Sequence, residues 1–242
     1  MLIVVSPAKA LDFESPLPTS KHSQPVMLDS SEALVQIMAG KSPADLSKMM
    51  SISSKLAELN HERFQDWTTP FNTDNARPAV LAFDGDTYTG LDAPASFSER
   101  DYTHAQKVLR ILSGLHGILR PLDLIQPYRL EMGSKVEHDS GGDLYSYWGD
   151  TVTNELNDAL EASPGAKVLV NLASNEYFSV VQPERFDGRI ITPRFLDAKG
   201  DGDHKIVSFF AKQARGSMAG WIVRERITTA KALTGFDANG YR

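Results

Sequence analysis

Two places in the sequence combine polar or charged side chains with the end of a short apolar segment. The first is the β-branched run at residues 2–5, which Ser6 and Pro7 end and which Lys9 follows closely. Such a run predicts a buried strand that ends in a turn. Because open α/β sheets bind ligands at the carboxyl ends of their strands, Lys9 is a candidate contact for an anion. A surface lysine beside a turn explains the same residues equally well.

The second place is the apolar segment 167–172, which continues through Ala173 and Ser174 into a helical pattern. Ser174 is typical of a helix N-cap, so free backbone amides are expected directly after a buried strand. Amides at a helix N-terminus bind phosphate and other anions. With Asn171, Ser174 and Asn175 as donors, the segment predicts an anion pocket. Capping alone accounts for Ser174 but not for the two asparagines near it.

Residues 42–67 have the pattern of two short helices joined by a tight turn. Ser42 before Pro43 is typical of an N-cap followed by the first helical position. The helical spacing of apolar residues breaks at residues 51–53 and then resumes. Two helices that meet at such a turn resemble the helix-hairpin-helix element that binds the DNA backbone.

The turn itself consists of Ser51, Ile52 and Ser53, where a helix-hairpin-helix normally has a glycine, an apolar residue and a glycine. Amides in such a turn donate to phosphate oxygens, and Lys48 and Lys55 are placed to add charge. Serine keeps the amides but loses part of the close approach that glycine allows. An ordinary corner between two helices explains the same pattern equally well.

Residues 113–133 form an unusual segment, since glycines, prolines and arginines alternate there with leucine, isoleucine and methionine. Pro121 and Pro127 remove backbone donors and favour extended geometry in the residues before them, whereas the apolar side chains require burial. A buried, irregular segment that carries arginines is typical of a binding site. We expect it to hold Arg120 and Arg129 toward a cleft.

The formal net charge of -6 hides an uneven distribution of charged residues along the chain. Residues 136–163 contain seven Asp and Glu but no Lys or Arg, whereas residues 183–242 contain eleven Lys and Arg against seven Asp and Glu. An acidic total alone argues against a nucleic-acid partner, but it does not show how the signs are distributed. The basic excess in residues 183–242 would suit a binding surface, although ordinary solvated faces would give the same composition.

Short apolar segments alternate with amphipathic patterns along the chain, and no interdomain linker is visible. Residues 188–197 and 204–210 alternate around a turn rich in glycine and aspartate, which predicts a hairpin. The strand-like sequence near Phe236 stops at Arg242, so we expect the natural chain to continue. The patterns predict a mixed α/β fold in which a single compact domain, residues 1–242, surrounds a central mixed sheet. Further strands are predicted at residues 2–5, 79–83, 128–132 and 167–172, and helices at residues 29–38, 42–67, 98–112, 144–160 and 211–226.

Composition excludes several classes of protein. The absence of cysteine excludes disulfides, thiolate zinc sites and cysteine-ligated iron–sulfur clusters, and it suits a reducing cytoplasm. No apolar run approaches the length of a membrane span, so no membrane partner is expected. Glu58 and His61 have the spacing of a di-iron ligand pair, but a di-iron site needs two such pairs, so we assign no metal site. The chain lacks a P-loop, a dinucleotide fingerprint and an assignable triad, so we assign no catalytic residue and no cofactor.

Four motifs, at residues 6–9, 112–133, 171–178 and 212–218, carry a resemblance to a known family. Together and in this order they resemble the YaaA family of bacterial peroxide-stress proteins over nearly the whole chain. The resemblance implies a cytoplasmic protein that is made under hydrogen peroxide stress and limits damage from unincorporated iron. It also implies a mixed α/β fold of its own type, with a helix-hairpin-helix and a basic cleft that binds DNA.

On this resemblance the partner is double-stranded or distorted DNA, which we expect a monomer to bind without catalysis. The hairpin at residues 51–53, with Lys48 and Lys55, is the candidate for the helix-hairpin-helix contact. The candidate cleft residues are Lys9, Arg120, Arg129, Arg194, Lys205 and Arg215.

Two other functions remain open. An enzyme or a binding protein for a nucleotide or another phosphorylated small molecule would use the pocket predicted at Asn171, Ser174 and Asn175, together with Lys9 and Glu176. Direct sequestration of iron would require clustered Glu, Asp and His side chains. Convergence of the basic residues on one cleft would favour DNA binding over both.

Overall fold

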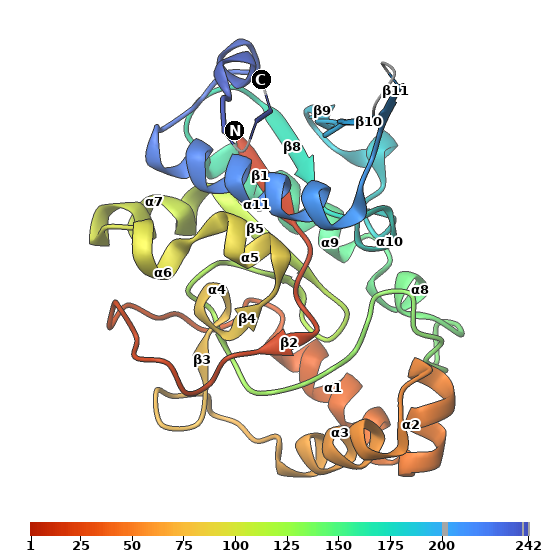
Figure 1. The fold of residues 1–242 in the computed structure, drawn as a ribbon. Coiled ribbons are helices and arrows are strands. Elements are labelled where there is room, and N and C mark those ends of the chain that lie inside the picture. Colours follow the sequence, from red (N-terminus) through yellow and green to blue (C-terminus); the bar gives the residue numbers. More distant parts are fainter. Residues whose placement is uncertain (200–202, 239, 242) are drawn as a thin grey trace.

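A five-stranded mixed sheet lies at the centre of the fold, with the strand order β6-β5-β1-β8-β9 (Figure 1). Strand β1 (Leu2–Val5) pairs in parallel with β5 (Leu109–Ser113) on one side and with β8 (Val168–Leu172) on the other. Strand β9 (Arg189–Ile191) continues the parallel part, and β6 (Gly117–Leu119) is an antiparallel edge strand. The mixed α/β fold with a central mixed sheet, predicted from the sequence, is therefore confirmed.

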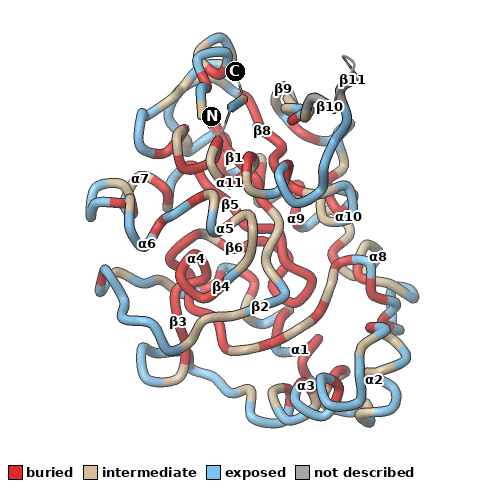
Figure 2. Tube along the Cα trace, in the orientation of Figure 1, coloured by how far each residue is buried: buried red, intermediate tan, exposed pale blue. Residues whose placement is uncertain are grey.

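The core lies along β1, β5 and β8, which are buried over their whole length (Figure 2). The computed structural model describes all residues of the chain except 200–202, 239 and 242. Strands that are covered on both faces need nearly continuous apolar sequence, and β1 and β8 have it. Because these two strands are parallel neighbours, their carboxyl ends lie side by side, and the Ser174 amide donates to Ser6 Oγ at 2.9 Å.

Strand β5 replaces the end of the helix that the sequence predicts at residues 98–112. Helix α7 (Glu99–Val108) stops four residues earlier, and Leu109–Ser113 pairs with β1 instead. The predicted helix is too long because the apolar residues of this run fit a buried strand as well as a helix. The strand also buries Arg110, and this burial lowers the pKa of its guanidinium to about 10.

Helix α11 (Ser208–Arg224) crosses one face of the sheet, where it contacts β1 and β8 (Figure 1). It packs so closely against α5 (Asp86–Leu91) that a side chain does not fit between them. A Cβ atom on Gly216 would collide with the carbonyl oxygen of Thr87. This close packing holds the corner before α5 beside the carboxyl end of the sheet.

Three helices form the lower half of the molecule in Figure 1, namely α1 (Leu28–Ala39), α2 (Pro43–Met50) and α3 (Ser54–Asp66). Helix α2 begins as the sequence predicts, because Ser42 and Asp45 form a capping box around its first turn. Two short ladders lie between these helices and the sheet, β2 (Ala10–Leu11) with β4 (Phe83–Asp84) and β3 (Arg77–Pro78) with β7 (Leu124–Ile125).

Two of the predicted strands are wrong. Residues 79–83 begin with α4 (Ala79–Ala82), a fully buried helical turn. A short apolar run suits a buried helix as well as a buried strand, so its periodicity does not decide between them. Residues 128–132 are irregular and pair with no strand among the described residues. Their alternation instead brings Arg129 and Glu131 together as an ion pair.

The helix predicted at residues 144–160 is interrupted. Two helices, α8 (Leu144–Trp148) and α9 (Thr151–Ala162), replace it. Between them Gly149 has a φ of 46°, in the left-handed region that favours glycine. Apolar spacing does not reveal this break. The remaining helices are α6 (Ala93–Ser96) and α10 (Asn175–Phe178), with 3-10 turns at Pro183–Arg185 and Lys231–Gly235.

The hairpin predicted near the C-terminal end exists in a shorter form. Strands β10 (Asp197–Lys199) and β11 (Asp203–Lys205) are antiparallel, and residues 200–202 between them lie outside the described residues. Residues 189–191 belong to the central sheet, and residues 208–210 form the first turn of α11 rather than the end of a strand. The last helix is therefore longer at its N-terminal end than its sequence pattern predicts.

Residues 113–133 lie largely in the core, as the sequence predicts. Ser113 Oγ is 2.6 Å from the Tyr128 hydroxyl, and His116 Nδ1 is 2.9 Å from Ser31 Oγ in helix α1. Burial lowers the pKa of His116 to about 3, so its imidazole is neutral at physiological pH. These contacts tie the segment to the sheet and to the lower helices, which makes it a structural hub.

Candidate nucleic-acid interface

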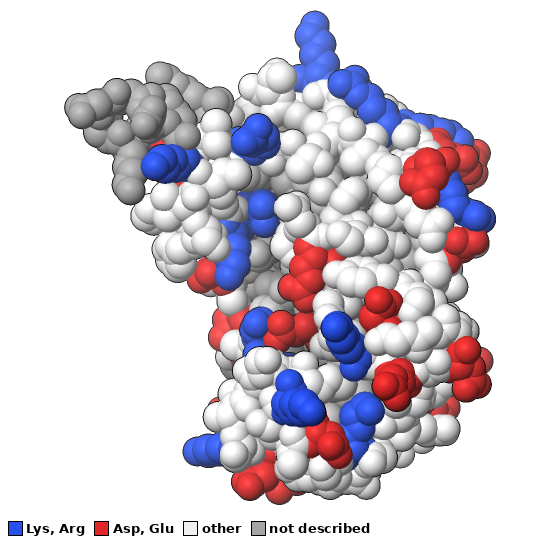
Figure 3. Space-filling model, turned by 90° about the vertical axis from the view of Figure 1, so that its right-hand side faces the viewer, with Lys and Arg blue, Asp and Glu red and all other residues white. Residues whose placement is uncertain are grey.

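A groove lies at the carboxyl ends of β1 and β8, between the upper and lower halves of the molecule. It consists of two neighbouring cavities that share Lys9 and Glu176: an upper cavity of about 450 Å³ and a lower cavity of about 460 Å³. Figure 3 shows the surface hollowed between the two halves, with both basic and acidic side chains on its walls. Open α/β sheets bind ligands at this edge, so the groove is the candidate site.

The lower cavity lies between the turn after α2 and residues 129–134. Glu131 accepts there from two cations, since Lys9 Nζ is 3.0 Å from Oε2 and Arg129 Nη2 is 3.0 Å from Oε1. These three side chains together keep a net positive charge. The Nε atom of Arg129 is also buried and has no hydrogen-bond partner among the described residues. An anionic oxygen would match the vacant donor.

Besides the shared Lys9 and Glu176, the upper cavity has two basic and two acidic side chains from different elements. Lys212 and Arg215 are three residues apart on α11 and line the same cavity. Burial lowers the pKa of the Arg215 guanidinium, which nevertheless stays charged at neutral pH. Asp84 and Asp86 lie on the corner between β4 and α5. Within the described part of the chain, none of these four side chains has an ion-pair or hydrogen-bond partner.

The three residues of the predicted anion pocket do not all face this groove. Ser174 lines the upper cavity, and its amide is already taken up by Ser6 Oγ. Asn171 is buried, and its side chain donates to Thr192 Oγ1 at 3.3 Å and accepts from a backbone amide two residues further on at 3.0 Å. Asn175 is exposed and lines neither cavity. Internal hydrogen bonds therefore account for Asn171, as N-capping does for Ser174.

Helices α2 and α3 are joined at residues 51–53, as the sequence predicts, but most of the amides of this turn are occupied. Ser51 has a φ of 51° and donates its amide to the Ser47 carbonyl. The Ile52 amide donates to the same carbonyl at 3.1 Å, and the Ser47 hydroxyl donates to the Ile52 carbonyl at 2.7 Å. The pair of helices is thus present, whereas a helix-hairpin-helix element is not confirmed.

The side chains around this turn are nevertheless accessible. Ser51 lines the lower cavity, and Ser53 caps α3. Lys48 and Lys55 are exposed, and neither has an ion-pair partner among the residues that the structure describes. Lysine ammonium groups bind a phosphate without help from the amides of the turn, so both side chains are available to an anion at the lower rim of the groove.

Comparison with known proteins places the whole sequence in one family. Residues 1–242 match the family described as peroxide stress protein YaaA. The chain belongs to the YaaA family. It is similar to a UPF0246 protein of Alteromonas mediterranea, with 56% identity over 241 residues that cover 100% of this chain and 92% of the relative. Membership of the YaaA family supports a role in the peroxide stress response and confirms the resemblance carried by the four sequence motifs.

Arg120 of this YaaA-family chain lies outside both cavities of the groove. Its Nη2 atom is 2.9 Å from Asp123 Oδ1, and its Nε donates to the same carboxylate at 3.0 Å. Nη2 also donates to the carbonyl of Gln24 at 2.8 Å. Since Asp123 is fully buried, these contacts give Arg120 a structural partner instead of an open position in a cleft.

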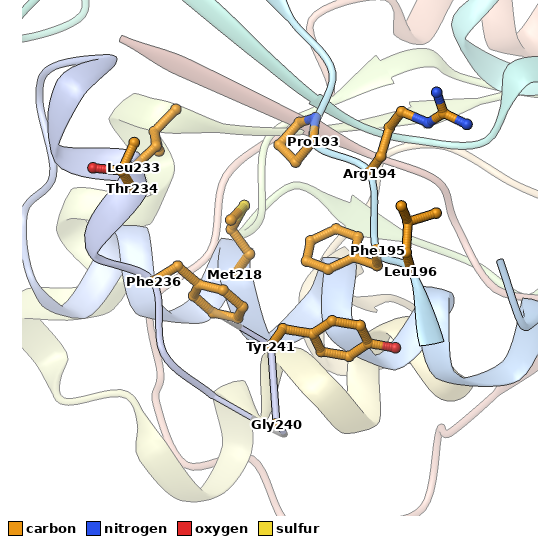
Figure 4. Close-up of a pocket in the computed structure, with 10 residues that line it drawn as sticks. All are labelled: Pro193, Arg194, Phe195, Leu196, Met218, Leu233, Thr234, Phe236, Gly240 and Tyr241. Carbon is orange, nitrogen blue, oxygen red and sulfur yellow. The ribbon is translucent and has the colours of Figure 1, made fainter. Parts of the chain in front are cut away.

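Arg194 and Lys205 lie near the β10–β11 hairpin rather than in the groove cavities. Arg194 lines a separate cavity of about 440 Å³ with the rings of Phe195, Phe236 and Tyr241. Figure 4 shows its guanidinium directed away from these rings. Lys205 ends β11 and is exposed. Of the cleft residues predicted for the YaaA-family chain, the groove therefore brings together Lys9, Arg129 and Arg215.

Sequence reasoning missed three side chains that line the upper cavity. Lys212 lies three residues before Arg215, and this spacing on a helix was a usable signal that both face the same way. Asp84 and Asp86 flank Gly85, a pattern that indicates only a turn. Nothing local in the sequence shows that this turn meets the end of β1, so the acidic pair is visible only in three dimensions.

Metal-binding clusters and membrane-spanning helices are both absent from the described part of the chain. No group of three or more His, Cys, Asp or Glu side chains is arranged there to hold a metal ion. None of the helices described for this YaaA-family chain is both long and apolar enough to cross a membrane.

Proposed function

We propose that the protein is a DNA-binding protein of the hydrogen peroxide stress response, which protects DNA and limits damage from free intracellular iron. The groove and its rims hold duplex or distorted DNA through contacts to the sugar–phosphate backbone, and no catalysis is involved. One observation carries this proposal: basic side chains without an ion-pair partner among the described residues lie both above and below the groove. Below the groove they are Lys48 on α2 and Lys55 on α3. Above it they are Arg194 and Lys205 near the β10–β11 hairpin, and Lys212 and Arg215 on α11, which also line the upper cavity.

The charges inside the groove balance one another, which affects where a phosphate can bind. The cavities are lined by four cations and four carboxylates, Lys9, Arg129, Lys212 and Arg215 with Asp84, Asp86, Glu131 and Glu176. Carboxylates repel phosphates, so we place the DNA backbone along the six cations without an ion-pair partner, and away from Glu131, which already pairs with Lys9 and Arg129. Backbone contacts of this kind supply affinity and orientation without sequence preference.

The salt dependence of binding tests this proposal. Each phosphate that a protein neutralises contributes about -0.9 to the slope of log affinity against log salt, so these six cations predict a slope of about -5. Fluorescence anisotropy with a short labelled duplex measures it. We expect Lys55→Ala and Lys212→Ala each to flatten the slope by about one unit. The matched control Lys107→Ala removes an exposed lysine on α7 and leaves the slope unchanged. Affinity that is independent of salt would contradict the proposal.

Protection from iron-dependent damage needs a separate assay. Ferrous iron and hydrogen peroxide generate hydroxyl radicals that nick supercoiled plasmid DNA. We expect the protein to slow nicking in proportion to the DNA that it covers, and we expect the double variant Lys55→Ala, Lys212→Ala to protect less. Equilibrium dialysis against ferrous iron distinguishes this from sequestration, because stoichiometric iron binding would point to removal of iron rather than coverage of DNA.

A second candidate function is that of an enzyme or a binding protein for a nucleotide or another phosphorylated small molecule. The upper cavity favours it, because its volume of about 450 Å³ suits one such ligand and because Ser174 and Arg215 line it. The predicted position at Asn171 and Asn175 is less suitable, since neither side chain lines this cavity. Thermal-shift titration with nucleotides and sugar phosphates tests this function, and a melting temperature that stays constant counts against it.

A further inference from the structure

Four separate segments enclose the upper cavity of the groove. They are the loop after β1, the corner before α5, the region where β8 leads into α10, and helix α11. The volume of about 450 Å³ falls in the range of pockets that hold one small ligand, and a duplex cannot enter it. Lys9 and Glu176 line both cavities. A ligand in the upper cavity therefore lies next to a DNA strand that is bound along the groove.

One wall of this cavity is suited to a phosphate. Arg215 is partly buried, and no described residue supplies a counter-ion or a hydrogen-bond acceptor for its guanidinium. A desolvated charge without a partner costs free energy, which an anionic ligand at this position would recover. Lys212 lies one helical turn away and lines the same cavity. A guanidinium and an ammonium side by side are the usual protein partners of a phosphate group.

The corner before α5 has the opposite chemistry. The side chains of Asp84 and Asp86 offer carboxylate oxygens as hydrogen-bond acceptors, and no described residue donates to them. Pairing between β2 and β4 places Asp84 opposite Ala10, which fixes this corner against the loop after β1. A phosphate cannot bind to carboxylates, whereas the amino groups on the edges of nucleobases donate to them readily. The ligand that suits both walls therefore has a phosphate at one end and N–H donors at the other.

Apart from Lys9 and Glu176, neutral groups line the rest of the cavity. Pro7, Ala8 and Leu172 supply apolar surface, and Tyr177 adds an aromatic ring. Burial raises the pKa of Tyr177, so its phenol remains uncharged at neutral pH. The Tyr88 hydroxyl donates to the Ser6 carbonyl at 3.2 Å and holds this loop in place. Apolar and aromatic surface of this kind suits the faces of a nucleobase.

We propose that the upper cavity receives a single nucleotide that swings out of the DNA strand bound along the groove. Its phosphate contacts Lys212 and Arg215, and the amino group of its base donates to Asp84 and Asp86. Adenine, guanine and cytosine have such an exocyclic amino group, and thymine lacks one. The inference rests on the proposed DNA binding, because bound DNA supplies the nucleotide. Since mismatched or damaged bases leave the stack most easily, the cavity would be filled most often on distorted DNA.

2-Aminopurine is a suitable probe, because it has an exocyclic amino group and its fluorescence rises when it leaves the base stack. The experiment places it at a mismatch within a duplex and measures its fluorescence with the DNA saturated by protein. Saturation removes any effect of affinity on the signal. We expect the wild-type protein to raise the fluorescence of the probe at the mismatch. In a fully paired duplex the rise should be smaller, because the paired probe is harder to unpair.

The double variant Asp84→Asn, Asp86→Asn tests the acidic wall. It removes the charged acceptors, which we expect to lower the ratio of extruded to stacked probe by about tenfold or more. It also removes two negative charges near DNA, so its affinity for the duplex should rise rather than fall. If the double variant only disturbed the fold, the extrusion of the probe and the affinity for the duplex would both decrease. The control Asp74→Asn has the same chemistry on an exposed loop and should match the wild type.

Each other outcome overturns a defined part of the inference. A wild-type protein that binds the duplex without any rise in fluorescence overturns the nucleotide site but leaves the proposed DNA binding intact. A fluorescence rise that survives the double Asp variant also overturns the assignment of this cavity. A protein that binds no DNA overturns the inference together with the proposed function. Stabilisation by free deoxyguanosine monophosphate, combined with a probe that stays stacked in bound DNA, would assign the cavity to a free nucleotide instead.

Discussion

Replacing Arg120 by methionine tests whether this residue supports the fold or binds DNA. The Asp123 carboxylate is 0% exposed and accepts hydrogen bonds at 2.6–3.0 Å from three donors, namely Ser23 Oγ, the Arg120 backbone amide and Arg120 Nε. It also forms an ion pair with Arg120 Nη2 at 2.9 Å. Methionine keeps the apolar part of the side chain but removes the positive charge, so the substitution leaves a buried carboxylate without a counter-ion.

The expected loss of stability follows from this geometry. Removing one partner of a buried ion pair costs about 3–5 kcal/mol. The Arg120 side chain is 29% exposed, so water screens part of the interaction. Asp123 also keeps its hydrogen bonds from Ser23 and from the backbone amide. We therefore expect Arg120→Met to lower the free energy of unfolding by about 2–3 kcal/mol, which corresponds to a decrease of roughly 4–12 °C in melting temperature.

Urea denaturation measures this loss, and a double-mutant cycle with Asp123→Asn isolates the ion pair. In the Asn background the same arginine substitution should cost at least about 1 kcal/mol less, because no buried charge is left uncompensated. The matched control Arg100→Met removes an exposed arginine without an ion-pair partner among the described residues and should change stability by less than about 0.5 kcal/mol.

Two results would refute this structural interpretation of Arg120. One is an Arg120→Met protein as stable as the wild type. The other is a loss of DNA affinity in the variant, measured well below its melting temperature, that is comparable to the loss caused by Lys212→Ala. In that case the guanidinium would contact DNA after all, as its position in the segment 113–133 predicts.

Three further predictions concern other parts of the molecule. Gly216→Ala should lower the free energy of unfolding by about 2 kcal/mol in urea denaturation, because the new methyl collides with the Thr87 carbonyl. The control Gly142→Ala should have little effect, because no atom lies within 4 Å of its added carbon. Burial lowers the pKa of His116 to about 3 in the folded chain, whereas the same imidazole is protonated in the unfolded chain below its ordinary pKa. The free energy of unfolding should therefore decrease by about 1.4 kcal/mol for each pH unit as the pH falls from 6 to 4. His116→Phe should remove this part of the pH dependence, and an unchanged slope would contradict the assignment. Arg215→Met should raise the melting temperature, since a partly buried charge is removed, while anisotropy shows weaker DNA binding.

The sequence predicts best those elements that have distinct boundaries. The runs at residues 2–5 and 167–172 are short, apolar and followed by turn or capping residues, and both are parallel core strands. The strand at Leu109–Ser113 follows a helix without any intervening glycine or proline, so the helical pattern hides its start. Its identity as a strand comes from pairing with β1, which lies more than 100 residues away in the chain. Local periodicity does not contain that information.

The candidate site was only partly predictable for a related reason. Lys9 was found from its position after a strand, and it does line the groove. Arg120 and Asn171 also have side chains that could bind an anion, but Asp123 and Thr192 take up their polar groups. Whether a charged or amide side chain is available to a ligand depends on partners that folding brings near it. Residue type alone therefore overestimates the number of binding residues.

The parallel pairing of β1 with β8 explains why a site forms at this edge at all. It brings Ser6 and Ser174, 168 residues apart, into hydrogen-bond contact, and it leaves the loops after both strands on the same side of the sheet. Helix α11 then crosses this edge, and its contact through Gly216 draws the acidic corner before α5 to within reach of Arg215. Basic and acidic groups thus line one cavity because the β1–β8 pairing and the contact between α11 and α5 meet at this edge. A surface that evolved only to attract phosphate would not need Asp84 and Asp86 at this position, and their presence is the strongest reason to expect a ligand with donors as well as negative charge.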